Sequence, residues 1–533
     1  MKNKSEEKET KKIAVVGLGT GLTAVWAMEN QGNFQVTGFD SGSSPGGHIN
    51  SFSLQGRGKD GDLMAPVIVE GGAEFIGPPE KYPHVHALFE HLGVELKPYQ
   101  LNMEFHNHQK KDKLVLPPAY FTSDGIGAQR SGCFPFLTSF FRKGQSQKKL
   151  TIDTHSLLCH FDDMLKMKSV IDDAEDLEPG VRKAKKQAVK IQQAKDKTLP
   201  PEKMKTLEQF VNAFIDGDKS KQDFADQFLY PLIAAGWGVS VDTIKTFGAH
   251  YAMNYLKAGD TWYDAPEGLS SYIDAMREQC GKTRFELDCT IKQLIPVAVD
   301  GQTKYQLLTQ DDRLIMDDHG EPMLYDDVML TSPAYITNEL LADIEDKTIQ
   351  DLREKLKAVE YYDTTVVFHQ DKRYESEVGA VVHTRYDGER AANTMCKKWK
   401  FQEGDTPIMK TWVLPGQPMP KNVLVVKQYR HPVMNQAYYE AQQALHHTQG
   451  QAGLWFGGIL GGNSDAHESG ISVALQVAAT LCQRERCLEV NERLKLFPDV
   501  IKSVQPGAPC DLVCGVDHDE QSEGSSLAMS PMG

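Results

Sequence analysis

Three glycines near the N-terminus could hold the phosphates of a dinucleotide. Gly17, Gly19 and Gly21 follow the apolar run IAVV, but the usual turn is G-x-G-x-x-G, so this turn is one residue short. The first glycine permits a sharp bend, the second lets the backbone approach the pyrophosphate, and the third lets helix and strand pack closely. Thr20 lies within this turn, and the helix N-terminus that follows would attract the phosphates.

An acidic residue strengthens the nucleotide hypothesis. Asp40 ends the next β-rich run, NFQVTGFD, close to the spacing of roughly 20 residues at which an acid binds a ribose hydroxyl. An acid at this position favours an adenosine ribose without a phosphate, as in FAD or NAD. The alternative is an ordinary strand-end aspartate that begins a loop.

A pair of glycines just beyond Asp40 points to a flavin. The segment VTGFDSGSSPGGH resembles the flavin amine oxidase and phytoene desaturase superfamily, whose Gly-Gly pair lies against the FAD pyrophosphate. The resemblance implies that Gly46 and Gly47 contact FAD, with His48 beside them. It therefore predicts an α/β fold with a discontinuous, Rossmann-type (GR2-like) FAD-binding domain and an inserted mixed α+β substrate domain.

Further segments resemble the same superfamily in the same order, over roughly residues 12–485. VEGGAEFIG resembles its loop near the flavin ring, CTIKQLI the backbone around adenine, and LWFGGILGGNSDAHESGISVALQVAATL its last strand, loop and helix. HES-G resembles a bacterial branch described as predicted NAD/FAD-binding proteins. The cofactor contacts that the resemblance implies in these segments are Gly72, Ala73, Ile291, Gly458, Ile459, Gly470 and Ile471.

Three departures from the pattern keep a second hypothesis open. The glycine turn is short, Ile459 stands where many relatives have an acid, and Ser469 stands where the bacterial branch has Asp. The chain is therefore predicted to be an FAD-dependent oxidoreductase, with a degenerate, non-catalytic scaffold or binding protein as the alternative. A nicotinamide-dependent dehydrogenase is disfavoured by the Gly46-Gly47 pair.

Two titratable side chains are the catalytic candidates, because flavin enzymes rely on the cofactor for the redox step. Glu74 could orient substrate or move a proton, or it could pair with an arginine and be structural. His467, with Glu468 beside it, could approach the pyrimidine end of the flavin, or the two could cap the helix that starts nearby. The clustered histidines lack a metal-ligand pattern, so no metal site is predicted; they are His84, His86, His91, His106 and His108.

The order of the elements divides the chain into two domains. Strand, helix and strand patterns over 12–40, β-rich stretches over 281–335, and a strand and helix over 451–485 predict an FAD-binding domain from 12–100, 280–340 and 450–485. The substrate domain would comprise 101–279 and 341–449. Residues 1–11 and 515–533 are expected to be a disordered leader and tail.

Composition excludes several classes of protein. The net charge of −15 argues against a nucleic-acid partner, and no apolar run is long enough to span a bilayer. With no signal-like N-terminus, a cytoplasmic protein with reduced cysteines is expected. The sequence does not indicate an oligomeric state.

The expected substrate is an apolar small molecule, such as a fatty acyl chain or a polyene. Aromatic residues are concentrated in 133–141 and 250–263, where they would form apolar walls or simply domain core. The lysine-rich stretch 181–205 is expected to be a solvated helix, with peripheral membrane contact as the alternative.

Overall fold

The computed structural model describes residues 10–29, 31, 33–109, 112–116, 205–254, 261–462 and 467–504. The predicted disordered tail 515–533, the aromatic stretch 133–141 and all but the last residue of 181–205 lie outside these ranges. The predicted leader ends too late, because the first strand already begins at Lys11.

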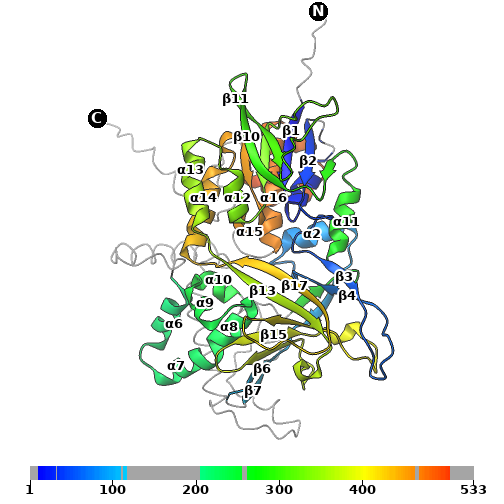
Figure 1. Ribbon diagram of the computed structural model, residues 1–533, viewed down its shortest axis with the longest axis vertical. Coiled ribbons are helices and arrows are strands. Elements are labelled where there is room, and N and C mark those ends of the chain that lie inside the picture. The colour runs from blue at the N-terminus through cyan, green and yellow to red at the C-terminus, as the bar shows by residue number, and fades with distance from the viewer. Residues whose placement is uncertain are drawn as a thin grey trace, which may run out of the picture.

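A five-stranded parallel sheet forms the upper part of the molecule in Figure 1. Its order is β18-β12-β1-β2-β9, and each neighbouring pair runs parallel. Because both faces of such a sheet are covered, its inner strands are almost continuously apolar. The strands are β1 (Lys11–Val16), β2 (Phe34–Phe39), β9 (Arg284–Glu286), β12 (Asp327–Leu330) and β18 (Leu454–Phe456).

The helices that follow the first and last strands pack together on one face of this sheet. Every residue of α1 (Gly21–Met28) is buried, which explains why its sequence is apolar except for Thr23, and the helix packs on α16 (His467–Arg484). The helix ends at Met28, because the Glu29 backbone becomes extended. Two further helices, α2 (Pro83–Leu92) and α11 (Ser270–Glu278), complete this layer.

A seven-stranded mixed sheet forms the lower part (Figure 1). Its order is β17-β13-β16-β15-β14-β6-β7, in which the pair β14–β6 is parallel and the remaining pairs are antiparallel. Its strands are β6 (Met103–Asn107), β7 (Asp112–Leu116), β13 (Tyr361–His369), β14 (Val382–Tyr386), β15 (Ala391–Met395), β16 (Met409–Val413) and β17 (Val423–Pro432).

Three two-stranded pairs lie outside the two large sheets. They are β3 (Ser51–Leu54) with β4 (Val67–Glu70), β5 (Lys97–Gln100) with β8 (Thr261–Asp264), and β10 (Ile291–Val299) with β11 (Gln302–Thr309). The β3–β4 hairpin packs Phe52 against Phe368 of the seven-stranded sheet. The hairpin follows the glycine segments in the chain, and this contact places it on the lower sheet.

Short helices surround both sheets. At the lower left of Figure 1 lie α6 (Leu207–Ile215), α7 (Lys219–Phe224), α8 (Tyr230–Trp237), α9 (Val241–Thr246) and α10 (Ala249–Asn254), with a π-helical turn (Ala225–Leu229) between α7 and α8. The upper part adds α12 (Ala334–Leu340), α13 (Lys347–Lys357), α14 (Gln436–Thr448), α15 (Gly458–Gly461) and α17 (Pro498–Ser503).

The hydrophobic core does not divide along the predicted domain boundary. One cluster contains residues on the face of the upper sheet that points away from α1, such as Val16 and Phe39. The same cluster contains residues of the lower helices, such as Phe210, Phe228 and Tyr251. The second cluster lies between the upper sheet, α1, α2 and α16. The predicted α/β class with a mixed second layer is confirmed. Among the described residues, no helix is long and apolar enough to cross a membrane.

Candidate functional site

The shortened glycine turn is compact and packs on β12. Gly17 has a φ of 95°, in the left-handed region that favours glycine, and a Cβ there would lie 2.6 Å from Thr331 Oγ1. A Cβ on Gly21 would lie 3.0 Å from both Thr331 Oγ1 and Val15 Cγ1. The protein's own packing therefore requires glycine at both ends of the turn.

The middle glycine has a different environment. A Cβ on Gly19 would meet nothing closer than Gly46 O at 3.8 Å and Gly47 Cα at 4.0 Å, and its φ is not positive. Nothing in the protein's packing therefore explains why this residue is glycine. Gly47 faces Gly19, is exposed and has a φ of 57°. The two glycine segments leave their backbones bare toward each other, as the approach of a pyrophosphate requires.

Asp40 links the glycine turn to the loop that leads to Gly46 and Gly47. Its Oδ2 accepts a hydrogen bond from Leu18 N and its Oδ1 accepts one from Gly42 N, each at 2.8 Å. Gly46 N also donates to Leu18 O at 2.8 Å. Each carboxylate oxygen has a second lone pair, so these bonds leave acceptor capacity for a ribose hydroxyl. The role of Asp40 in ribose binding stays a prediction.

Two helix N-termini meet at the glycine turn. Thr20 is the N-cap residue of α1, and a Cβ on Gly470, in the first turn of α16, would lie 2.6 Å from Thr20 Cγ2. Because unpaired N–H groups at helix N-termini attract anions, this meeting suits a phosphate group. Ile471 is fully buried, so its side chain serves packing.

The remaining predicted contacts lie around this turn. Gly458 has a φ of 73°, and a Cβ on it would lie 2.8 Å from Thr331 O; Ile459 follows in α15 and packs partly on the core. Ile291 begins β10 and is buried. The loop before it runs along Asp40, because Cys289 N donates to Asp40 O at 2.9 Å.

The Gly-Gly-His segment also contacts the loop that contains Glu74. Ala73 N donates to His48 O at 2.9 Å, and a Cβ on Gly72 would lie only 2.1 Å from the same oxygen. The His48 ring lies 5.2 Å from the rings of both Tyr429 and His431, which come from β17. Burial lowers the pKa of His48, and burial together with His48 lowers the pKa of His431 to about 3. The His431 imidazole is therefore neutral at pH 7.

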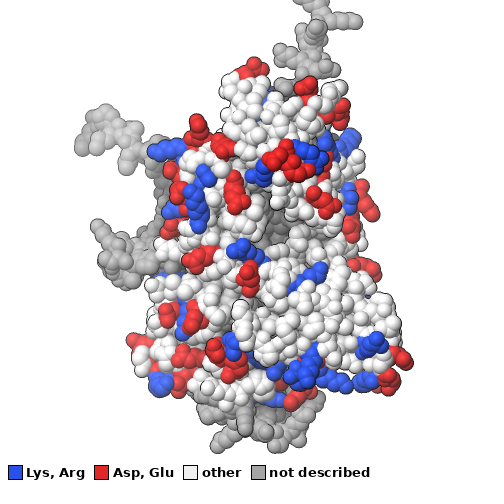
Figure 2. Space-filling model, in the orientation of Figure 1, with Lys and Arg blue, Asp and Glu red and all other residues white. Residues whose placement is uncertain are grey.

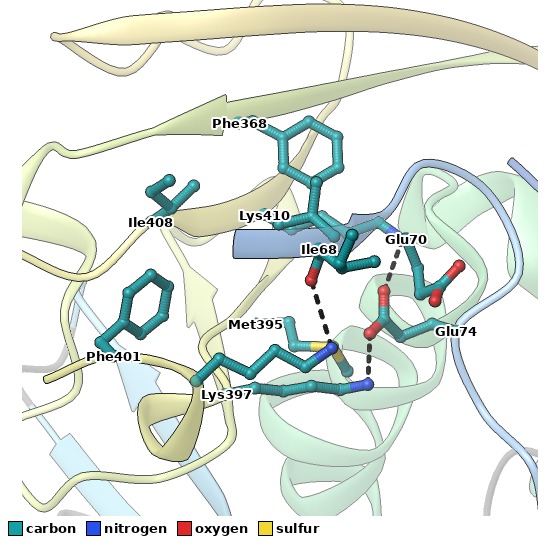
Figure 3. Close-up of a pocket in the computed structure, with 11 residues that line it drawn as sticks. Ile68, Glu70, Glu74, Phe368, Met395, Lys397, Phe401, Ile408 and Lys410 are labelled. Atoms are coloured by element: carbon teal, nitrogen blue, oxygen red, sulfur yellow. Dashed lines mark hydrogen bonds and ion pairs between the residues drawn. The ribbon is translucent and has the colours of Figure 1, made fainter. Parts of the chain in front are cut away.

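Glu74 lies in a buried network of charges (Figure 3). Its carboxylate accepts from Lys397 Nζ at 2.7 Å and from Lys410 Nζ at 2.8 Å, and Lys410 also donates to Gly72 O at 2.9 Å. Lys397 additionally contacts Asp264 Oδ1 at 2.5 Å. Burial alone would raise the pKa of Glu74, but the two ammonium groups lower it to about 2.

The expected roles of Glu74 are therefore revised. Its partners are lysines rather than an arginine, and a carboxylate with a pKa near 2 is a poor proton acceptor at neutral pH. Lys410 instead links Glu74 to the Gly72 carbonyl, so the network holds the loop in place.

His467 and Glu468 face different neighbours. His467 Nε2 lies 2.7 Å from the Tyr272 hydroxyl, and its buried Nδ1 has no hydrogen-bond partner within the described ranges. Burial lowers the pKa of His467 to about 4. Glu468 does not cap its own helix, as one alternative supposed. Its Oε1 and Oε2 accept from His84 N and Val85 N at the start of α2, and Oε1 also contacts His84 Nδ1.

The structure thus brings together the predicted phosphate-binding residues but separates the two catalytic candidates. Gly17, Gly19, Thr20, Gly21 and Gly470 converge on one point, whereas Glu74 and His467 belong to different hydrogen-bond networks. A dinucleotide with a pyrophosphate fits this arrangement, because Gly19 and Gly47 leave their backbones bare. A flavin carbonyl or N–H group would satisfy the orphan His467 Nδ1.

Several residues that contact the predicted site residues were not predicted from the sequence. They are Lys397, Lys410, Asp264, Tyr429 and His431. A lone lysine within the apolar strand IMKTWV was a usable signal for Lys410, because burying an unpaired charge is costly. Within the part of the chain that is described, no group of three or more His, Cys, Asp or Glu residues is placed to hold a metal ion.

Comparisons with known proteins agree with this geometry. The family model described as flavin-containing amine oxidoreductase matches residues 20–414. No curated protein matches the chain in sequence. Several solved structures share the fold at low sequence identity.

Three of these structures are similar over most of their length. A CLA-producing fatty acid isomerase from P. acnes has a TM-score of 0.55 at 14% identity, covering 90% of this chain and 99% of the isomerase. Cyclohexylamine oxidase from Brevibacterium oxydans IH-35A has a TM-score of 0.54 at 14% identity, covering 90% and 100%. Putrescine oxidase bound to putrescine has a TM-score of 0.52 at 10% identity, covering 89% and 99%. The chain belongs to the flavin-containing amine oxidoreductase family, which confirms the prediction of FAD as its cofactor.

Proposed function

We propose that the protein is an FAD-dependent oxidoreductase that acts on an apolar small molecule. When bound, the flavin supplies the redox chemistry by exchanging hydride with a substrate carbon. The observation that carries the proposal is the bare backbone of Gly19 opposite Gly47, beside the N-termini of α1 and α16. These features support a working phosphate site despite the missing turn residue.

The chain's own residues would position the cofactor and control protons around it. Gly46, Gly47 and Gly19 would hold the pyrophosphate, and His467 would offer Nδ1 to a polar edge of the flavin. His48 lies beside the Gly72 loop, so its imidazole could accept a proton from substrate, whereas His431, with a pKa of about 3, is as poor a proton acceptor as Glu74. Glu74 would fix the loop rather than move a proton.

The proposed substrate class rests on the apolar lining of a cavity in the lower part of the molecule. Apolar side chains such as Phe368, Met395 and Ile408 line the cavity next to Glu74. On the face shown in Figure 2, Lys, Arg, Asp and Glu are intermixed, which does not favour nucleic acid. The named relatives act on amines or isomerise a fatty acid, so oxidation, desaturation and isomerisation are all open to this fold. Peripheral membrane contact, the alternative expected for 181–205, stays a prediction.

The second candidate is a non-catalytic member of the same fold that acts as a scaffold or binding protein. Two observations favour it: the turn is one residue short, and Ile459 provides no acid at the last strand. Visible absorbance of the purified protein and identification of any released nucleotide separate the two. A yellow protein that releases FAD supports the oxidoreductase. A colourless protein that also fails to take up added FAD contradicts it and supports the scaffold.

A further inference from the structure

A small cavity of about 40 Å³ lies beside the Glu74 network, between the β3–β4 hairpin and the lower sheet (Figure 3). This volume accommodates a group of a few heavy atoms, since one water needs about 10–15 Å³. Its walls are apolar at one side and charged at the other. The apolar lining residues are Ile68, Val69, Phe368, Met395, Phe401 and Ile408.

The carboxylates at the charged side are already satisfied. Both oxygens of Glu74 accept from lysines. Glu70 accepts from Ser51 Oγ at 2.7 Å through Oε2 and from Leu269 N at 2.9 Å through Oε1. Burial and the neighbouring Glu74 raise the pKa of Glu70, which moves it toward its neutral form. Little negative charge is therefore left to receive a cationic ligand.

The ammonium groups, by contrast, retain donor capacity. Lys400 Nζ donates to Ile68 O and contacts Asp264 Oδ2, both at 3.2 Å, so among the described residues one of its three N–H bonds has no partner. Lys397 and Lys410 each make two polar contacts and lie over the rings of Tyr99 and Trp412. The Lys400 side chain is 13% exposed, so a bond to this free donor would be poorly screened by water.

We propose that this cavity is a subsite for the carboxylate of an apolar carboxylic acid, with Lys400 as its principal donor. The apolar side would hold the adjoining carbons, and the lysines would hold the anionic oxygens. The inference deepens the proposed function and rests on it, since it assigns a headgroup to the apolar substrate.

The test compares three ligands with one chain length on the purified full-length protein, with flavin content measured on the same sample. Octanoate, 1-octanol and octylamine are titrated by calorimetry at pH 7. Octanoate is expected to bind at least about tenfold more tightly than the other two, because a charge-assisted hydrogen bond is worth that much. Equal affinity for octanol, or tighter binding of octylamine, overturns the proposal.

Matched variants locate the subsite. Lys400→Met should weaken octanoate by about tenfold and leave octanol unchanged, while Lys400→Arg should retain most of the preference. Lys398→Met is the control, because Lys398 is a neighbouring lysine that pairs with Glu375 and does not line the cavity. An unchanged octanoate affinity in Lys400→Met contradicts the assignment.

The two proposals fail separately. A flavin-loaded protein without a preference for octanoate contradicts the subsite alone. A protein that cannot take up FAD but still prefers octanoate contradicts the oxidoreductase while supporting the subsite.

Discussion

At the scale of single residues, the three glycines of the turn have different roles. Gly17 and Gly21 are fixed by contact with Thr331, whereas Gly19 has no such contact and faces Gly47. The compact glycine turn was predictable because glycine spacing reflects backbone geometry directly, and its role in phosphate binding stays a prediction. Of the two roles expected for Glu74, the buried lysine pairs favour the structural one. Its partners could not be predicted, because they lie more than 300 residues away in the chain, and no local sequence pattern indicates a contact of that separation.

Gly19→Val tests the phosphate site. The added side chain would stand where the pyrophosphate approaches, so flavin content should fall below about a tenth of the wild-type level, while folding is retained. Absorbance of the purified variant and circular dichroism measure the two quantities.

Gly281→Val is the matched control. A Cβ on Gly281 meets nothing within 4 Å and its φ is not positive, so the variant should keep its flavin. If Gly19→Val also purifies with full flavin, the phosphate lies elsewhere.

At the scale of elements, α2 depends on α16 for its N-terminal cap. Glu468 accepts from two backbone N–H groups of α2 and from the His84 ring, and His84 Nε2 contacts Asp499 of α17 at 2.8 Å. The helix predicted within 451–485 exists as α16. The contact between Glu468 and the start of α2 could not be predicted, because a helix cap normally comes from the residue just before the helix.

His84 makes this contact between α2 and α16 sensitive to pH. Burial lowers the pKa of His84, but Glu468 and then Asp499 raise it more, so the net pKa lies above its usual value. The protonated ring therefore stabilises the folded state fully below about pH 6.5, and that contribution is lost as pH rises through the folded-state pKa.

The comparison of wild type with His84→Asn measures this contribution. The variant should lose about 1–3 kcal/mol of unfolding free energy at pH 6, and the difference should shrink toward pH 9. Urea unfolding across this pH range tests the sign. A difference that grows with pH would show that the neutral ring makes the stabilising bonds.

At the scale of the whole molecule, the two layers share one hydrophobic cluster and one buried charge network. Lys397 follows β15 of the lower sheet and contacts Glu74, which follows β4, and Asp264, which ends β8. The two-layer fold was predictable from the resemblance. The shared core was not, because alternating apolar residues show which face of an element is buried but not against which partner.

Lys397→Met measures what the network contributes. Removing one ammonium leaves Glu74 with Lys410 and Asp264 with Lys400, so the loss should be up to about 3 kcal/mol, below that for an orphaned buried charge. Chemical denaturation monitored by circular dichroism gives the value.

Lys398→Met provides the baseline for that measurement. This lysine is 40% exposed, so its variant should change stability by less than about 1 kcal/mol. Equal losses in the two variants would mean that the network contributes no more than a surface ion pair.

The bond from Glu468 to α2 spans 384 residues of chain. During synthesis at about 5–20 residues per second, α2 therefore waits roughly 20–80 s for its cap. The last strand of the parallel sheet, β18, emerges from the ribosome only shortly before that residue. The nascent chain consequently spends most of its translation time with an unfinished nucleotide-binding layer, and any chain that stops before β18 is expected to depend on chaperones rather than on FAD for protection.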